Sequence, residues 1–166
     1  MEEEFCHFVA ARGASLCRTA YLLTGDWQAG EDLVQEALAK TYLRRRRLRD
    51  QSALEPYTRK VLMTLFLSSR RRQWSKELPF AELPDHAGAP APASIDEFAE
   101  RDGLWQALAE LPAQQRAVLV LRYFEDRSEA EIAAALNCPP GTVKSHAARG
   151  LDRLRKTVAV TEGWPR

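Results

Sequence analysis

The sequence predicts an all-α chain: two small helical bundles joined by a proline-rich linker, the second bundle containing a helix-turn-helix. Apolar residues recur with a period near 3.6, and no segment alternates as a strand would. Four of the nine prolines fall between residues 75 and 93, where the helical pattern stops. A chain of 166 residues, 45% of them apolar, suffices for one ordinary domain or two small ones. The expected boundaries are 1–74 and 94–160, with the linker at 75–93.

The first bundle is predicted to contain three amphipathic helices. The first covers residues 5–23 and ends at the turn Thr24–Gly25. Asp26, a good N-cap residue, begins the second helix, and Pro56, suited to a first helical position, begins the third, which ends at residues 70–72. The inner stripes are Leu33, Val34, Ala37, Leu38 and Thr41 on the second helix and Thr58, Val61, Leu62, Leu65 and Ser69 on the third.

The second bundle begins after the linker. Residues 94–97 (Ser-Ile-Asp-Glu) form a capping box that opens a helix reaching about Glu110. Pro112 begins the next helix. Its expected core residues are Val118, Leu119 and Leu121.

The last part of the chain has the dimensions of a helix-turn-helix. Ser128 and Glu131 make a second capping box, Asn137 suits the left-handed end of that short helix, and a final helix covers about 140–158. The small side chains of Ala130, Ala133, Ala134 and Ala135 would let the two helices approach closely, and the residues expected to be buried on the final helix are Val143, Ala147, Gly150, Leu151 and Leu154.

One face of the final helix is polar at steps of three and four residues. Hydroxyls, an imidazole and three cations share this stripe, and such groups bond base edges and phosphates. The pattern favours DNA binding, although a helical hairpin with a solvated polar face would look similar. The stripe is Thr142, Ser145, His146, Arg149, Arg153 and Lys156, and Lys144 flanks it.

The net charge of +1 hides a strong separation of sign. Residues 40–76 hold twelve basic and two acidic residues, a net charge of +10, whereas 1–39 and 77–110 carry −5 and −7 and 111–166 carry +3. The basic block should attract phosphate, which leaves the acidic blocks for a different partner. A solvated basic helix is the alternative for the run at residues 44–47.

Composition also argues against several classes of protein. No run of eighteen apolar residues occurs and the N-terminus is acidic, so we expect no membrane insertion, no export signal and a cytoplasmic location. Cys6, Cys17 and Cys138 are expected to be free thiols, and Cys6 with His7 lacks the further ligands of a metal site. The three histidines lie in different segments and no nucleophile or carboxylate pair accompanies them, so we expect no enzyme, no cofactor and no metal.

Several segments together resemble the bacterial extracytoplasmic-function (ECF, group IV) sigma factors of RNA polymerase, in the sigma-70 family. They are Asp32–Ala37 (DLVQEA), the basic third helix, the linker, Leu111–Leu119 (LPAQQRAVL) and Gly141–His146 (GTVKSH). The resemblance covers about Phe5 to Lys156, and these segments in this order are highly specific. It implies a subunit that binds core RNA polymerase and promoter DNA and directs initiation at −10 and −35 elements.

The resemblance assigns roles to particular positions. Polymerase binding falls on Asp32, Gln35 and Glu36, and −35 recognition falls on Thr142, Lys144, Ser145, His146, Arg149 and Arg153. The −10 element falls to the second and third helices and the loop between them, with Arg59, Lys60, Thr64, Arg70, Arg71 and Arg72 as contacts and Tyr42, Tyr57 and Trp74 available to stack on melted bases. Thr64 and His146 depart from the asparagine and arginine common there, which bears on promoter preference. Many relatives are held inactive by an anti-sigma protein, a further candidate partner.

A different class of function remains open from the residues alone. A self-sufficient helix-turn-helix regulator would use its N-terminal helices to dimerise and would bind a palindrome. Light scattering separates the two, because a sigma subunit should be a monomer when free.

Overall fold

The computed structural model describes residues 2–75 and 102–160, and the side chains of residues 2–70 and 105–157. All the regular elements in these ranges are helical and none is a strand, which confirms the predicted all-α class. The predicted capping box at 94–97 and the linker beyond Ser75 lie outside the described residues.

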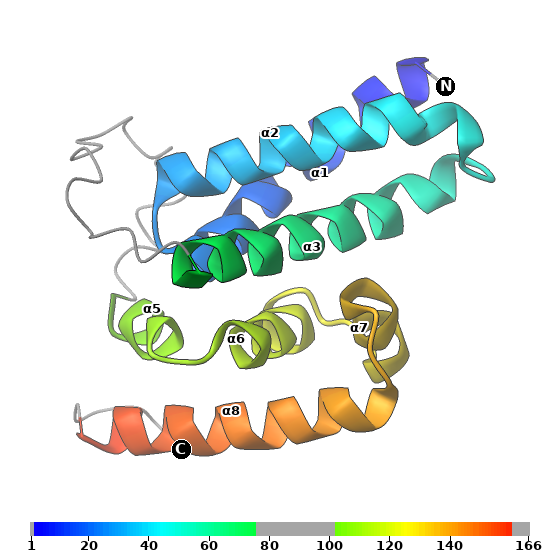
Figure 1. The fold of residues 1–166 in the computed structure, drawn as a ribbon. Coiled ribbons are helices and arrows are strands. Elements are labelled where there is room, and N and C mark those ends of the chain that lie inside the picture. The colour runs from blue at the N-terminus through cyan, green and yellow to red at the C-terminus, as the bar shows by residue number, and fades with distance from the viewer. Residues whose placement is uncertain (1, 76–101, 161–166) are drawn as a thin grey trace.

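The N-terminal half consists of three long helices packed on one another (Figure 1). They are α1 (Glu2–Thr24), α2 (Trp27–Arg44) and α3 (Leu54–Ser75), and two short 3-10 turns, Arg45–Arg47 and Gln51–Ala53, connect α2 to α3. Between α2 and α3 the hydroxyls of Thr41 and Thr58 share a buried hydrogen bond of 3.0 Å. This bond satisfies two polar groups inside an otherwise apolar core.

The turn between α1 and α2 follows the predicted pattern. Gly25 has a φ of 76°, in the left-handed region that glycine adopts without a steric penalty. The carboxylate of Asp26 accepts hydrogen bonds from the backbone N–H groups of Gln28 at 2.7 Å and Ala29 at 3.1 Å. The predicted N-cap of the second helix is therefore confirmed.

Helix α3 differs from the prediction in two respects. It begins at Leu54 rather than Pro56, and Pro56 still lies in the first turn, where its missing N–H removes no helical hydrogen bond. Ser69, expected on the inner stripe, is exposed, whereas Met63 and Phe66 are buried. Phe66 lies toward the C-terminal half, with its ring centre 5.9 Å from the guanidinium of Arg116. Packing from that second side widens the buried face beyond the stripe that one bundle would produce.

The C-terminal half contains α5 (Asp102–Ala109), α6 (Ala113–Leu119), a π-helical extension at Val120–Phe124, α7 (Glu129–Leu136) and α8 (Pro140–Val160). The predicted core residues Val118, Leu119 and Leu121 are buried. Ser128 accepts a hydrogen bond from the Glu131 N–H at 3.1 Å, and Asn137 ends α7 with a φ of 52°. Both predicted ends of the short helix are confirmed, and α8 runs two residues beyond the predicted Val158.

The two halves are packed against each other along α3 (Figure 1). One buried apolar cluster runs through both, from Phe8 in α1 to Ala147 in α8. Trp105 of α5 lies over Gly25, so closely that a Cβ atom there would overlap its indole. The sequence pattern predicts two bundles but gives no sign of this contact.

Candidate nucleic-acid interface

The outer face of α8 carries the residues predicted to contact duplex DNA. Val143, Ala147 and Gly150 are buried on the opposite side, so the helix is fixed with its polar stripe facing outward. The side chains of Arg149 and Arg153 are exposed and form no salt bridge within the described part of the chain. The predicted residues Thr142, Lys144, Ser145, His146, Arg149 and Arg153 all lie at exposed or half-buried positions.

Small residues hold α8 close to its neighbours. Ala133 and Ala135 of α7 are buried, as expected for a close helix pair, whereas Ala130 and Ala134 are exposed. At Gly150 an added Cβ would lie 3.0 Å from the Leu119 side chain, tighter than ordinary van der Waals contact. The position of α8 relative to the core is therefore set by packing on its inner side.

His146 lies at the edge of this stripe, between the exposed and the buried side of α8. Its ring is half-buried, and its Nδ1 atom is buried with no hydrogen-bond partner among the described residues. A buried ring nitrogen without a partner is uncommon, because leaving it unpaired is unfavourable. The sequence spacing predicts the outward position of His146 but not this partly covered ring.

The residues predicted to bind polymerase lie together on α2. Asp32, Gln35 and Glu36 are all exposed and share one face at helical spacing, while Leu33 and Val34 beside them are buried. Asp32 accepts a hydrogen bond of 3.0 Å from Gln28, and Glu36 lies 3.9 Å from Lys40. Both contacts are on the surface, so these carboxylates remain available to another molecule.

The predicted −10 residues of α3 are in different environments. Lys60 and Thr64 are exposed one turn apart, and Thr64 donates a hydrogen bond of 2.8 Å to the Lys60 carbonyl. Arg70 is half-buried, and burial lowers its pKa. The side chains of Arg71, Arg72 and Trp74 lie outside the described set.

Arg59 departs most from the expectation of a free cation. It is only 5% exposed, and its guanidinium is held by two carboxylates: Nε donates to Glu125 at 2.6 Å and Nη2 donates to Glu55 at 2.8 Å. Glu125 belongs to the C-terminal half, so this contact joins the two halves. In this arrangement Arg59 does not face solvent.

Further charges complete a cluster that sequence reasoning missed. Arg127 donates to Glu55 at 2.9 Å, and Arg12 of α1 lies 3.4 Å from the same carboxylate. The Thr19 hydroxyl donates to Glu125 at 2.8 Å. Among the described pairs of this cluster, those at i,i+4 spacing, Glu55–Arg59 and Arg127–Glu131, could have been found from the sequence, and the others could not.

The resemblance segment Leu111–Leu119 contains a second buried cation, Arg116. Its guanidinium donates to backbone carbonyls only, including Leu23 at the end of α1 at 2.6 Å. Helix C-termini present unpaired carbonyls and partial negative charge, which suits a cation. Burial, and to a lesser extent the charge of Arg70, lower the pKa of Arg116 to about 10. The other accepting carbonyls belong to Leu108, Ala109 and Leu111.

The loop after α2 exposes basic and apolar groups together. Leu43 is 81% exposed, beside the exposed Arg44, and Arg45 stacks on the Tyr42 ring at 3.5 Å from its centre. The Tyr42 hydroxyl donates to Glu2 at 2.9 Å. Tyr42 is thus committed to cation and hydrogen-bond contacts within the chain.

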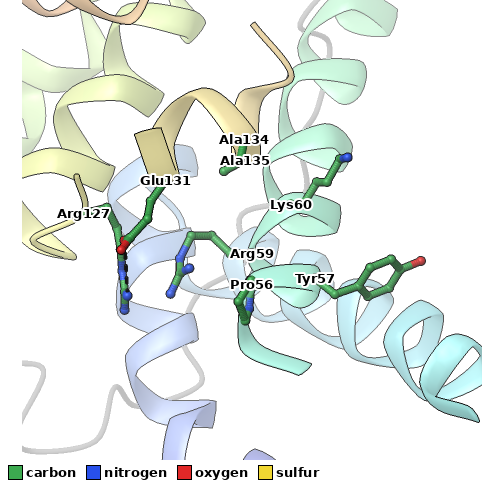
Figure 2. A pocket seen from close by; sticks show the side chains of 8 residues that line it. All are labelled: Pro56, Tyr57, Arg59, Lys60, Arg127, Glu131, Ala134 and Ala135. Carbon is green, nitrogen blue, oxygen red and sulfur yellow. Dashed lines mark ion pairs between the residues drawn. The ribbon is translucent and has the colours of Figure 1, made fainter. Parts of the chain in front are cut away.

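A pocket of about 360 Å³ lies between α3 and α7 (Figure 2). Figure 2 shows Arg59 reaching from α3 toward Arg127 and Glu131, whereas Tyr57 and Lys60 extend away from that cluster. The pocket marks an incompletely filled part of the junction between the halves. Its lining residues are Pro56, Tyr57, Arg59, Lys60, Arg127, Glu131, Ala134 and Ala135.

The described ranges hold neither a group of metal-binding side chains nor a membrane-spanning helix. Neither 2–75 nor 102–160 contains three or more histidine, cysteine or acidic side chains grouped so that they could hold a metal ion. Nor does any helix described there have the length and apolar character needed to cross a membrane.

Comparison with protein families matches both halves of the chain. Residues 8–76 match the family described as Sigma-70 region 2, and residues 101–154 match Sigma-70, region 4. α2 and α3 fall in the first match, and the helix-turn-helix falls in the second.

Curated proteins and solved structures agree with these families. The chain is 35% identical over 159 residues to an RNA polymerase sigma-E factor of Streptomyces coelicolor, covering 96% of this chain and 88% of that one. It is 31% identical over 149 residues to the ECF RNA polymerase sigma factor SigL of Mycobacterium tuberculosis, covering 87% and 83%. The fold matches the sigma factor RpoE from Bartonella quintana, solved with the anti-sigma factor NepR, with a TM-score of 0.74, 24% identity and coverage of 96% and 99%.

Proposed function

The chain belongs to the ECF group of the sigma-70 family of RNA polymerase sigma factors and directs transcription initiation as a promoter-specificity subunit, and on that premise we propose that separate surfaces carry its three binding tasks. The family membership establishes that such a subunit binds core polymerase and promoter DNA. No feature of the described residues favours the alternative of a self-sufficient regulator. The three surfaces bind the −35 element, the −10 element and core polymerase.

The −35 element is read by the outer face of α8 lying in the major groove. The observation that carries this assignment is the orientation of α8, which has buried Val143 and Ala147 on one side and the exposed Arg149 and Arg153, without a salt bridge to any described residue, on the other. Thr142, Ser145 and His146 lie on the same stripe, and Lys144 on its flank suits a phosphate.

The −10 element is bound by α3, with Lys60 and Thr64 as the exposed contacts. Arg59, Arg70, Arg71 and Arg72, on the same helix, are the further residues that we propose for this element. The net charge of +10 over residues 40–76 supports an interaction with the phosphate backbone of a melted strand.

Core polymerase is bound by the exposed face of α2 that holds Asp32, Gln35 and Glu36. The acidic side chains face outward over a buried apolar stripe, which leaves them free to pair with basic groups of a partner. Sigma factors are not enzymes in general, and we infer no catalysis by this chain and no cofactor. We also infer domain boundaries of 1–74 and 94–160 and a cytoplasmic location. We infer an anti-sigma partner as well, and co-purification from the native cell would test for that partner.

The −35 assignment is tested by run-off transcription with core polymerase on a promoter mapped in cells that overproduce the chain. Arg149→Ala should lower open-complex formation roughly ten- to a hundredfold if the arginine reads a base. Arg155→Ala is the matched control: this exposed cation lies on the same helix but off the stripe, so its removal should change little. Equal effects of the two changes would reduce the assignment to a general charge effect.

The polymerase assignment is tested by the affinity of the full chain for core polymerase. Asp32→Ala should weaken it, whereas Asp152→Ala removes the same charge from an exposed position on α8, away from the α2 face, and should not. If both variants bind core polymerase as the wild type does, the α2 face is not the docking surface.

A further inference from the structure

Arg59 has two competing partners, DNA in the proposed −10 complex and Glu125 in the structure, and it cannot bind both at once. The proposed −10 surface needs its guanidinium on DNA, yet in the structure its side chain is 6% exposed and lies 2.6 Å from a Glu125 carboxylate that is itself 8% exposed. The two residues are 66 positions apart and belong to different halves. The contact therefore exists only while the halves are packed together.

Glu125 is held in place from both sides of the junction. Its other oxygen accepts the Thr19 hydroxyl of α1 at 2.8 Å, and Arg127 lies 3.8 Å away within its own half. A carboxylate with one oxygen on a guanidinium and the other on a hydroxyl is well satisfied and shielded from salt. The N-terminal half therefore binds the Glu125 carboxylate through Arg59 and Thr19.

Carboxylates and phosphates bind guanidinium groups through the same charge-assisted hydrogen bonds. We propose that Glu125 occupies Arg59 in place of a DNA phosphate and so holds the free chain closed, and that the −10 surface is completed only when the C-terminal half leaves α3. The proposal rests on the −10 role of Arg59 given above. Lys60 and Thr64 stay exposed in the closed form, so that form retains part of the surface without its central cation.

The other polar contacts of the junction are compatible with opening, which must also expose part of the apolar cluster that the two halves share. Arg116 reaches a single carbonyl of the N-terminal half, and its other acceptors belong to its own half. The pocket of about 360 Å³ between α3 and α7 leaves part of the contact unfilled. Separation would leave Arg59 with Glu55 and Glu125 with Arg127, so neither charge is stranded.

The test uses the full chain and two independent readouts. Small-angle X-ray scattering gives the radius of gyration, and fluorescence anisotropy gives the affinity for a short labelled oligothymidine, which probes backbone binding without a promoter sequence. Glu125→Gln keeps the shape of the side chain and removes its charge. Thr19→Val removes the supporting hydroxyl at nearly constant volume. The matched control is Glu110→Gln, an exposed carboxylate of the C-terminal half that accepts a hydrogen bond from Thr157 of the same half.

Glu125→Gln should expand the chain and tighten oligothymidine binding, by about tenfold if the open form is roughly a tenth of the wild-type population. Thr19→Val should shift both readouts in the same direction by less, and Glu110→Gln should shift neither. If Glu125→Gln fails to fold by circular dichroism, Thr19→Val decides. An unchanged radius, or expansion without tighter binding, overturns the proposal.

Failure of the −10 assignment would look different. Arg59→Ala would then leave run-off transcription with core polymerase unchanged, while Glu125→Gln would still expand the free chain. If instead Arg59→Ala impairs transcription and Glu125→Gln leaves both the radius of gyration and the DNA affinity unchanged, the −10 assignment is supported. The proposal that Glu125 holds the free chain closed is then wrong.

Discussion

At the residue scale, Gly25 shows how local backbone and distant packing select one amino acid. Its φ of 76° is unfavourable for residues with a Cβ, and the Trp105 indole fills the space where a Cβ would be. Each requirement alone favours glycine. Together they join the turn of the N-terminal half to α5 of the C-terminal half.

Gly25→Ala should therefore lower the free energy of unfolding by about 2 to 4 kcal/mol, since both backbone strain and overlap with Trp105 must be relieved. Urea unfolding monitored by circular dichroism measures it. Gly13→Ala is the control, because Gly13 lies inside α1 and an added Cβ there meets only Val9 at 4.0 Å. That change should stabilise the chain by about 0.5 to 1 kcal/mol. Similar values for the two variants would contradict the role given to Trp105.

At the element scale, the short helix α7 depends on its caps. Ser128 satisfies the free N–H of Glu131, and α7 has only eight residues, so each terminal hydrogen bond matters to it. Because α7 packs against α8, losing the hydrogen bond at the N-terminus of α7 also affects the position of α8.

Ser128→Ala should destabilise the chain by about 1 kcal/mol, and Ser128→Asp should retain most of the stability because its carboxylate accepts the same hydrogen bond near a helix N-terminus. Thermal unfolding of the three proteins compares them directly. If alanine and aspartate are equally destabilising, the cap is not what holds this end of the helix.

Helix boundaries were predictable where a few neighbouring residues set them. Asp26, Ser128 and Asn137 act through hydrogen bonds or torsions within four residues, and all three were predicted correctly. The buried face of α3 was only partly predictable, since Met63 and Phe66 are covered in addition to the expected stripe. Periodicity gives the centre of a buried stripe but not its width when a second body packs on the same helix.

At the scale of the whole molecule, the contacts that join the halves had no signal in the sequence. Arg116 donates to the carbonyl of Leu23, 93 residues away, and backbone carbonyls leave no trace in composition. Arg59 was predicted as a DNA contact from the resemblance to sigma factors, which does not show how its side chain is paired in the free chain. Pairing it with Glu125 required the three-dimensional arrangement, since many acidic residues were available as partners.

The closed arrangement also determines how the free chain should behave toward duplex DNA. The face of α8 proposed to read duplex DNA is left uncovered by the junction, with Lys144, Arg149 and Arg153 among its exposed cations. If these neutralise about three or four phosphates, the binding constant should fall about a hundredfold between roughly 50 and 200 mM salt. The free chain should therefore bind duplex promoter DNA weakly in physiological salt.

Adding core polymerase should make promoter binding much tighter, because the −35 and −10 surfaces then bind the same DNA molecule. Once one surface is bound, the effective concentration of the other near its element is high, so the two affinities combine. Titration of labelled promoter duplex with free chain and with holoenzyme at several salt concentrations measures both quantities, and light scattering gives the mass of the free chain. Lys144→Ala should reduce the salt slope of the free chain by about 0.9, as expected for one lost phosphate contact. A dimer that binds a specific duplex at nanomolar affinity without polymerase would contradict this account, since its two recognition helices would need no polymerase to add a second DNA-binding surface.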